Sequence, residues 1–470
     1  MSVDAPSIAF PAAENFLEAV ATPLGFSAET AARVRFEGEG ALPSAFAVTD
    51  FASGTVGVAG LAASELIAGL FGEAPAVTVD RRLVSGWFGM SIQPVGWSLT
   101  PPWDPIAGDY ATSDGWIRLH TNAPHHRAAA LAVLGVEVDK SAVTAAVGKW
   151  RADELEAAVV ARGGCAATLR SLADWAFHPQ GRAVATEPVV IAERGGFGEP
   201  KRWAASRGRP LAGLRVLDCT RVLAGPVATR FLAGLGADVL RIDPPDWDEP
   251  AVIPEVTLGK RCARLDIKSR DGRAQFEKLL GDADAFVHGL RPGALDALGL
   301  GAEEREKIRP GLVDVSLDAY GWSGPWAGRR GFDSLVQMSA GIADEGMRVF
   351  GTDRPKPLPV QALDHAAGYV MAASVLGGLA LRLADGRGFF TRTSLARMAG
   401  LLASTGAGEA PAFAPFDEAD LAPETETTAW GPARRLKPPV EIEGAPLRWA
   451  LPASPLGSAE PEWRKEAAVA

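Results

Sequence analysis

The stretch from Leu211 to Asp243 constrains the fold of this chain more than any other. Its pattern predicts a strand, a turn, a helix and a second strand, at residues 214–218, 220–226, 228–235 and 237–242. Such a unit belongs to a parallel sheet. The turn follows a buried strand and opens a helix, where free amide groups and the helix dipole favour phosphate or another anion. The turn supplies only Gly225 and then Pro226, not Gly-x-Gly-x-x-Gly, which argues against a simple nicotinamide enzyme.

Strand and helix patterns keep alternating after this unit. Further strands are predicted at residues 264–267, 285–288 and 312–316, and helices at residues 272–280, 303–308 and 364–381. This alternation predicts an α/β fold with a Rossmann-like parallel sheet domain. A smaller α+β domain should precede it, because residues 108–120 predict a hairpin that is followed by helical patterns.

A Gly- and Pro-rich stretch, Glu193–Pro200, is typical of a linker and suggests a division into three parts. We expect residues 1–205 to form the smaller α+β region. Residues 206–400 should form the sheet domain, including the long helix that begins at Asp364. Residues 401–470 are rich in Pro and Glu and should form a tail that wraps the other domain or a partner.

Charge and cysteine content narrow the class of protein. The net charge is -10 over 470 residues, and no basic run supplies a nucleic-acid surface. Three separated cysteines without a neighbouring histidine cluster fit a reducing compartment and no metal site. No leader opens the sequence and no run of 18 apolar residues occurs, so we expect a cytoplasmic protein without a membrane span.

Two apolar helices rich in small residues are predicted to share a short motif. The first carries Asp50 and Gly54, and the second carries Asp364 and Gly368, each as Asp-x-x-x-Gly. The match indicates either an internal repeat or two capped helices of similar composition. Thr49 or Asp50 is placed to cap the first helix.

Five stretches resemble, in the same order, the family III CoA-transferases, a group that includes the formyl-CoA, carnitine and bile-acid enzymes and the related α-methylacyl-CoA racemases. They are residues 213–226, 235–243, 259–268, 291–299 and 321–333. The resemblance covers the C-terminal half and implies the fold of that family. In the N-terminal half, stretches that resemble the family's small domain precede the sheet domain instead of following it. The chain is therefore either circularly permuted, or it carries a partial, degenerate copy of the family's sequence ahead of a second copy.

The resemblance also implies a covalent mechanism. In this family an aspartate that opens a long helix attacks the acyl-CoA thioester and carries CoA to an acceptor acid, and Asp364 matches that aspartate. The alternative for Asp364 is plain helix capping.

Coenzyme A would be a substrate, with no tightly bound cofactor. By resemblance, Val222, Leu223 and Ala224 line the pantetheine and adenine side of the first turn. The candidates for the CoA phosphates are Arg241, Lys260, Arg261 and Arg291. The expected partners are an acyl-CoA and a small carboxylic acid, and the resemblance implies a homodimer.

Two other functions stay open. An acyl-CoA racemase would pair an aspartate with a histidine, but this chain has Phe332 where racemases have that histidine. A CoA-binding homologue that has lost catalysis is the second alternative, because the segment order is altered and His288-Gly-Leu290 replaces the usual Glu-Asn-Phe. The sequence does not identify the acyl group.

Overall fold

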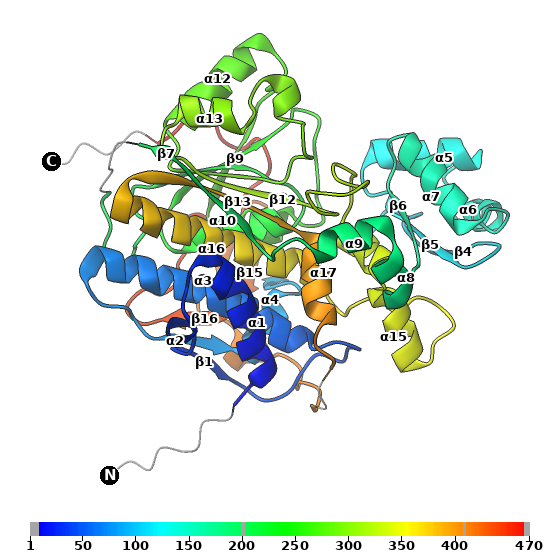
Figure 1. Cartoon of the computed structure of the whole chain (residues 1–470), viewed down its shortest axis with the longest axis horizontal. Helices are drawn as coiled ribbons and strands as arrows, with labels where there is room; N and C mark the ends of the chain where they lie inside the picture. Colours follow the sequence, from blue (N-terminus) through cyan, green and yellow to red (C-terminus); the bar gives the residue numbers. More distant parts are fainter. Residues whose placement is uncertain (1–8, 199–202, 408–409, 465–470) are drawn as a thin grey trace.

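A mostly parallel sheet of seven strands forms the centre of the computed structural model, which describes residues 9–198, 203–407 and 410–464 (Figure 1). In their order across the sheet, the strands are β10 (Lys260–Arg264), β9 (Asp238–Asp243), β8 (Arg215–Cys219), β11 (Ala285–His288), β12 (Val313–Asp318), β13 (Arg387–Ser394) and β7 (Ile191–Phe197). All neighbours run parallel except β13 and β7. The predicted parallel α/β sheet is thus confirmed. Strand β8 lies between β9 and β11, so the strands that follow it are placed first on one side of it and then on the other. Such a switch point leaves a crevice at the carboxyl ends of the strands.

Helices cover both faces of this sheet. The helices of this part are α10 (Ala224–Gly234), α11 (Ile253–Val256), α12 (Arg270–Gly281), α13 (Ala302–Ile308), α14 (Asp333–Ser339), α15 (Ile342–Phe350), α16 (Ala362–Asp385) and α17 (Leu395–Ala403), with a short 3₁₀ helix at Asp296–Leu298. Alternate strand residues face opposite layers: Val216 packs with α10 and α16, whereas its neighbour Leu217 packs with α12. Figure 1 shows α12 and α13 on one side of the sheet and α10 and α16 on the other.

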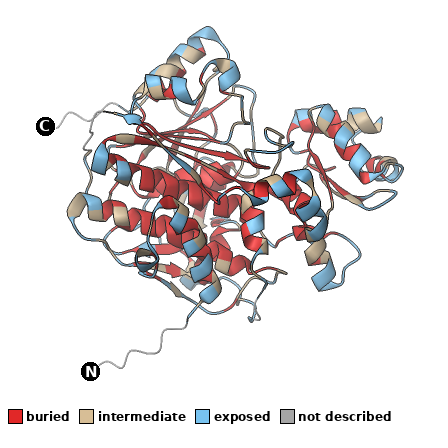
Figure 2. Ribbon diagram, viewed as in Figure 1, coloured by how far each residue is buried: buried red, intermediate tan, exposed pale blue. Residues whose placement is uncertain are grey.

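The N-terminal part packs directly on this domain. Its elements are α1 (Pro11–Ala21), a 3₁₀ helix (Thr22–Leu24), α2 (Ala28–Ala31), β1 (Val34–Glu37), α3 (Val48–Phe71), β2 (Val77–Asp80) and α4 (Arg81–Trp87). Helix α3 lies alongside α16 within one core (Figure 1). Both helices are long and apolar enough to cross a bilayer, but 72% and 83% of their most apolar windows are buried inside the protein (Figure 2).

A small α+β unit projects to one side of the molecule (Figure 1). It contains β4 (Gly108–Ala111), β5 (Trp116–Leu119), α5 (Pro124–Leu134), α6 (Lys140–Val147), α7 (Ala152–Ala161), β6 (Ala166–Thr168), α8 (Leu172–Phe177) and α9 (Pro179–Ala185). Strands β4 and β5 form the predicted hairpin, and β6 pairs antiparallel with β5.

The C-terminal tail returns to the N-terminal part. It contains a 3₁₀ helix (Glu418–Asp420), β14 (Glu426–Thr428), β15 (Gly431–Arg435) and β16 (Val440–Ile442). Strand β15 pairs with β3 (Ile92–Pro94), and β16 pairs with β2. Residue Trp463 then packs against the α12 side of the large sheet.

The structure corrects the predicted division into 1–205, 206–400 and 401–470. Residues 1–205 do not form one unit, because α3 belongs to the core of the sheet domain and only the later part forms the small α+β unit. The predicted linker is wrong up to Phe197, since Ile191–Phe197 is the edge strand β7. Its residues 199 and 200 lie outside the described part of the chain.

An internal correspondence relates the N-terminal part to the sheet domain. Helices α3 and α16 both have 24 residues, with Asp50 and Asp364 in their first turns. Each is followed by a strand and a helix (β2 and α4, β13 and α17). Each is also preceded by an 11-residue helix and a strand, with β1 directly before α3, whereas the rest of the sheet domain separates β9 from α16 (α1 and β1, α10 and β9). The shared order favours a partial internal copy over a circular permutation.

Candidate active site

The turn between β8 and α10 is held in an unusual conformation. Val222 has φ 63°, the only positive φ of a non-glycine residue in the described ranges, and a β-branched residue adopts that region at a cost. Its amide donates to Glu249 Oε2 at 2.8 Å. Gly225 is required here, because a Cβ at this position would lie 2.2 Å from Cγ2 of Thr220. The turn that carries Val222, Leu223 and Ala224 is therefore fixed at the switch point of the sheet.

Asp364 lies in the first turn of α16 and faces a second carboxylate. The Asp364 amide donates to Asp333 Oδ2 at 2.9 Å, and Gln337 donates to the other oxygen of Asp333. Among described residues, the Asp364 carboxylate has neither a hydrogen-bond donor nor a cation, and the N-cap of α16 is Gln361. The capping alternative for Asp364 is thus wrong.

Burial and like charge perturb both carboxyl groups. Burial and then the charge of Asp333 raise the pKa of Asp364 well above its ordinary value. Burial raises the pKa of Asp333 to about 6, against hydrogen bonds that favour its charged form. Carboxyl groups with perturbed pKa values are enriched at functional sites.

The internal correspondence supplies a contrast on α3. Asp50 occupies the position of Asp364, but its Oδ1 lies 2.8 Å from Nη2 of the buried Arg81. Neither Thr49 nor Asp50 caps α3, whose N-cap is Ala47 without a side-chain hydrogen bond, so that prediction is wrong. Arg81 thus neutralises Asp50, whereas Asp364 has no cation beside it among the described residues.

Gly368 brings Asp364 to the turn after β8. A Cβ on Gly368 would lie 2.4 Å from the carbonyl oxygen of Ala224, so α16 and the start of α10 are in backbone contact. Residues four apart share a helix face, which places Asp364 on the side of α16 that faces this turn. The predicted nucleophile and the predicted CoA turn are therefore neighbours.

Replacing Gly368 with Ala should separate these two helices. The added methyl group meets backbone, which cannot rotate away, so we expect unfolding to become easier by about 1–3 kcal/mol. We also expect turnover to fall more than this loss explains, because the turn moves away from Asp364. Denaturant unfolding and steady-state kinetics measure the two effects. Gly69→Ala is the control, since its added Cβ would meet only Leu383 Cδ2 at 3.6 Å.

Three of the four predicted phosphate ligands are committed to internal ion pairs. Arg241 is fully buried between Asp243 and Glu249, with Nε 2.8 Å from Asp243 Oδ2. Lys260 is also buried, 3.1 Å from Asp218 Oδ2 and 2.8 Å from the carbonyl oxygen of Pro226. The Arg261 guanidinium lies 3.0 Å from Asp238 Oδ2. The structure corrects these assignments: the three cations hold β8, β9 and β10 and the tail rather than a ligand.

Lys260→Met should therefore affect stability first. The variant leaves Asp218 buried with only hydroxyl and amide donors, which should cost about 3 kcal/mol of unfolding free energy. Lys260→Met combined with Asp218→Asn should recover much of that loss, as a denaturant series on the single and double variants would measure. A phosphate role would instead make the single variant stable but poor in CoA binding.

Arg291 lies at a different kind of site. It is exposed, its side chain makes no ion pair or hydrogen bond with the described residues, and it lines a cleft of about 600 Å³ between α7 and residues 325–330. The cleft also holds Arg330, which donates to the Gly163 carbonyl at 3.0 Å. Burial and then Arg330 lower the pKa of Arg291, as expected for neighbouring cations.

Sequence reasoning missed two arginines of this region. Arg330 is one of them, and the other is Arg221, which opens the turn after β8. The Nε atom of Arg221 is buried without a hydrogen-bond acceptor, and the guanidinium lies 5.0 Å from the Trp247 ring centre. Burial, Arg330 and Arg221 lower the pKa of His125, and Asp246 raises it. Arg330 therefore acts on both Arg291 and His125, and Arg221 acts on His125 as well; these three arginines, Arg221, Arg291 and Arg330, are called here the cation cluster.

Two histidines of the small unit lie against Phe332, the residue before Asp333 in the chain. His120 stacks on Phe332 with ring centres 3.9 Å apart, and burial lowers its pKa to about 3. His126 is buried, with both ring nitrogens lacking a partner in the described part. His365 instead stacks on Phe88, 5.0 Å away. An imidazole whose pKa is lowered as far as that of His120 is a weak base, which disfavours the racemase alternative.

Comparisons with known proteins agree with this geometry. The sequence profile of CoA-transferase family III matches residues 211–429. A succinyl-CoA:glutarate CoA-transferase of Mus musculus is 33% identical over 202 residues, which are 40% of this chain and 45% of that protein. An acetyl-CoA:oxalate CoA-transferase of Acetobacter aceti is 29% identical over 266 residues, covering 50% of this chain and 67% of that protein.

A solved structure also resembles this chain. The crystal structure of Rv3272 from M. tuberculosis has 31% sequence identity and a TM-score of 0.38, and the match covers 42% of this chain and 57% of that one. The chain spans about half the length of the first curated relatives that it matches.

Proposed function

We propose that this protein transfers CoA from an acyl-CoA donor to a carboxylic acid acceptor, because residues 211–429 match the sequence profile of CoA-transferase family III. The observation that carries the proposal is the unpaired Asp364 carboxylate beside the turn at Val222–Ala224. The names of the relatives, which include glutarate, oxalate and D-citramalate transferases, support small organic acids as substrates.

In the proposed reaction, Asp364 is the covalent carrier. Its carboxylate attacks the thioester carbonyl of the donor, which forms a mixed anhydride and releases the CoA thiolate. The thiolate then attacks the Asp364 carbonyl, which releases the donor acid and leaves an aspartyl-CoA thioester. The acceptor carboxylate reverses these steps and leaves as its CoA thioester. Exclusion of water matters here, because water would hydrolyse either intermediate.

The cation cluster would receive the phosphates of CoA. Phosphate oxygens pair well with planar guanidinium groups, and neither Arg221 nor Arg291 forms an ion pair with a carboxylate in the described residues, although Asp243 and Glu249 lie close enough to Arg221 to favour its charged form. The turn after β8 would lie along the pantetheine arm. A homodimer and a cytoplasmic location stay predictions from the sequence.

Mass spectrometry of the intact protein tests the covalent step. After incubation with acetyl-CoA or succinyl-CoA, the wild type should gain the mass of CoA less one water, as expected for an aspartyl-CoA thioester, and Asp364→Asn should not. An adduct that persists in the variant would contradict the assignment of Asp364. Binding of CoA without any adduct would favour the inactive homologue, and exchange of the α-hydrogen with deuterated water would favour a racemase.

A further inference from the structure

The carboxyl group beside Asp364 opposes one step of the proposed reaction. The acceptor acid is an anion that must approach Asp364, and Asp333 accepts the Asp364 amide at 2.9 Å. The hydrogen bonds of Asp333 favour its charged form, so it repels a second carboxylate. A cation near Asp333 would offset this repulsion, and the cation cluster is already assigned to the phosphates of CoA.

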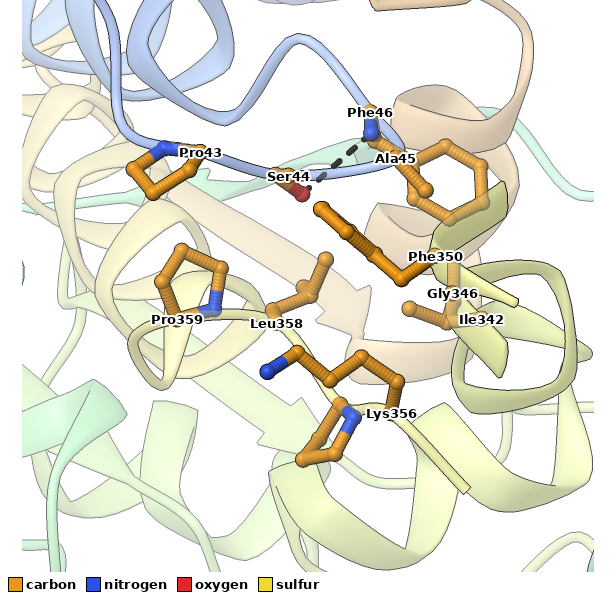
Figure 3. A pocket seen from close by; sticks show the side chains of 11 residues that line it. Pro43, Ser44, Ala45, Phe46, Ile342, Gly346, Phe350, Lys356, Leu358 and Pro359 are labelled. Atoms are coloured by element: carbon orange, nitrogen blue, oxygen red, sulfur yellow. Dashed lines mark hydrogen bonds between the residues drawn. The ribbon is translucent and has the colours of Figure 1, made fainter. Parts of the chain in front are cut away.

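The second cavity of the molecule does not supply this cation. It has a volume of about 250 Å³ and lies between residues 43–46 and 356–359 (Figure 3). Its lining contains neither Asp364 nor Asp333, and it does not include the turn after β8. Among the described residues of this lining only Lys356 is charged, and Lys356 is exposed.

One face of the small α+β unit packs on α14. Side chains alternate along β5, and Ile117 and Leu119 lie in the unit's own core. Trp116 and Arg118 therefore face the other way, where Trp116 packs against the cluster that contains Leu335 of α14. The guanidinium of Arg118 is thus carried on the face that meets α14.

His120 lies two residues after Arg118 and contacts both chain neighbours of Asp333. The His120 ring stacks on Phe332 with ring centres 3.9 Å apart, and its Nδ1 lies 3.5 Å from Oγ of Ser334. Burial and then the charge of Arg118 lower the pKa of His120. Burial raises the pKa of Asp333, whereas its hydrogen bonds and then Arg118 lower it, as expected of a neighbouring cation. Arg118 therefore acts at the start of α14.

The donors of Arg118 are only partly used. Its Nη1 donates to Asp109 Oδ1 at 2.7 Å. Its Nε is buried without an acceptor, and its Nη2 makes no hydrogen bond in the described part of the chain. The guanidinium carbon lies 4.7 Å from the ring centre of Trp103, which is 38% exposed, so these side chains border solvent. A guanidinium has five N–H donors, and the free ones can bind a carboxylate.

We propose that Arg118 binds the reacting carboxylate of the acid and brings it to Asp364. The guanidinium pairs with the carboxylate and offsets the charge of Asp333. One carboxylate oxygen attacks the carbonyl of the aspartyl-CoA thioester, and the carbon–sulfur bond breaks to release the CoA thiolate. The thiolate then attacks the acid's carbonyl in the mixed anhydride, which frees the Asp364 carboxylate. The inference rests on the proposed function and adds the residue that receives the acid.

Two nucleophiles of different charge test this role. The CoA adduct is prepared from acetyl-CoA and freed of excess substrate, and loss of the CoA mass from the protein is followed in a single turnover. Acetate is an anion and returns acetyl-CoA. Hydroxylamine is uncharged above neutral pH; its nitrogen attacks the Asp364 carbonyl and leaves a hydroxamate, and its proton passes to the released thiolate. Arg118→Gln should slow discharge by acetate at least about tenfold and keep discharge by hydroxylamine within about twofold, because one charge-assisted contact is lost.

Two further variants separate the charge from the fold. Arg118→Lys keeps a cation and should recover most of the discharge by acetate; no recovery would overturn the role of the charge. Arg127→Gln is the matched control, because Arg127 makes an ion pair of the same 2.7 Å length, with Asp104, in the same unit. Its loss should change discharge by neither nucleophile.

The outcomes separate this inference from the function on which it rests. Arg118→Gln should still acquire the adduct, because the donor thioester is uncharged at its reacting carbon. Equal losses with both nucleophiles, discharge by acetate at the wild-type rate, or an adduct missing only from the variant would each overturn the inference alone. The absence of an adduct in the wild type with every donor overturns the proposed function.

Discussion

Asp364→Asn is expected to reduce transferase turnover by at least about a thousandfold and to stabilise the folded protein at the same time. Turnover fails because the amide of Asn is no nucleophile toward a thioester. Stability rises because the variant removes a buried carboxylate that faces Asp333 and has no compensating donor. We expect a gain of about 2 kcal/mol near neutral pH.

The gain should depend on pH with a defined sign. The pKa of Asp364 is higher in the folded than in the unfolded protein, so the folded state loses stability as pH rises from the ordinary aspartate pKa through the raised one. Asn cannot ionise, and the stabilisation should therefore be larger at pH 8 than at pH 4. Denaturant unfolding at both pH values measures it. Equal gains at both pH values would show that ionisation of Asp364 is not the cause.

Asp50→Asn is the matched control, because it changes the same position of the corresponding helix. It should leave turnover unchanged and lower stability by about 2–3 kcal/mol, since the buried Arg81 loses its carboxylate and keeps only carbonyl acceptors. The two variants should thus change stability in opposite directions, and only Asp364→Asn should reduce turnover. A loss of turnover in Asp50→Asn would mean that the two helices share the chemistry.

The parallel sheet was predictable because its physical cause is local. Strands buried on both faces are short and apolar, and residues 285–288 were predicted without error. Strand β10 was displaced in the prediction, because its first two residues are the cations Lys260 and Arg261. Their partners, Asp218 and Asp238, lie on other strands and neutralise them only in the fold.

Residues 77–84 are a case in which the sequence pattern alone gives too long a strand. The alternating pattern of residues 77–84 predicts one strand, but Asp80 Oδ1 accepts the amides of Arg82 and Leu83. This capping starts α4 after only four strand residues. A competing local hydrogen bond overrides the alternation of apolar residues.

The site was predictable only where a motif marked it. Asp364 followed from the resemblance, whereas its partner Asp333 stood in a matched stretch without a role, since their contact joins residues far apart in the chain. For the cations, the residue type alone does not show that Arg241 is buried in ion pairs whereas Arg291 lines a cleft. Whether an arginine pairs with a carboxylate or faces a cleft depends on how several helices and strands pack together.

The cation cluster leads to the second large effect. Arg291→Gln and Arg330→Gln together should raise KM for acyl-CoA by about a hundredfold, at roughly tenfold for each lost charge-assisted contact, with kcat nearly unchanged. The phosphates lie far from the reacting thioester, so their contacts support binding of substrate and transition state alike. Higher salt should raise KM in the wild type and have less effect in the double variant.

A truncated substrate distinguishes phosphate binding from a general disturbance. An acyl-pantetheine thioester lacks the phosphates, so the wild type and the double variant should use it equally well. Arg261→Gln is the control, because that guanidinium is paired with Asp238 and should leave KM for acyl-CoA unchanged. Equal losses on both thioesters would place Arg291 and Arg330 at the acyl end. Arg330 also contacts the Gly163 carbonyl, so the Arg291→Gln single variant, which breaks no contact in the described structure, isolates the charge itself.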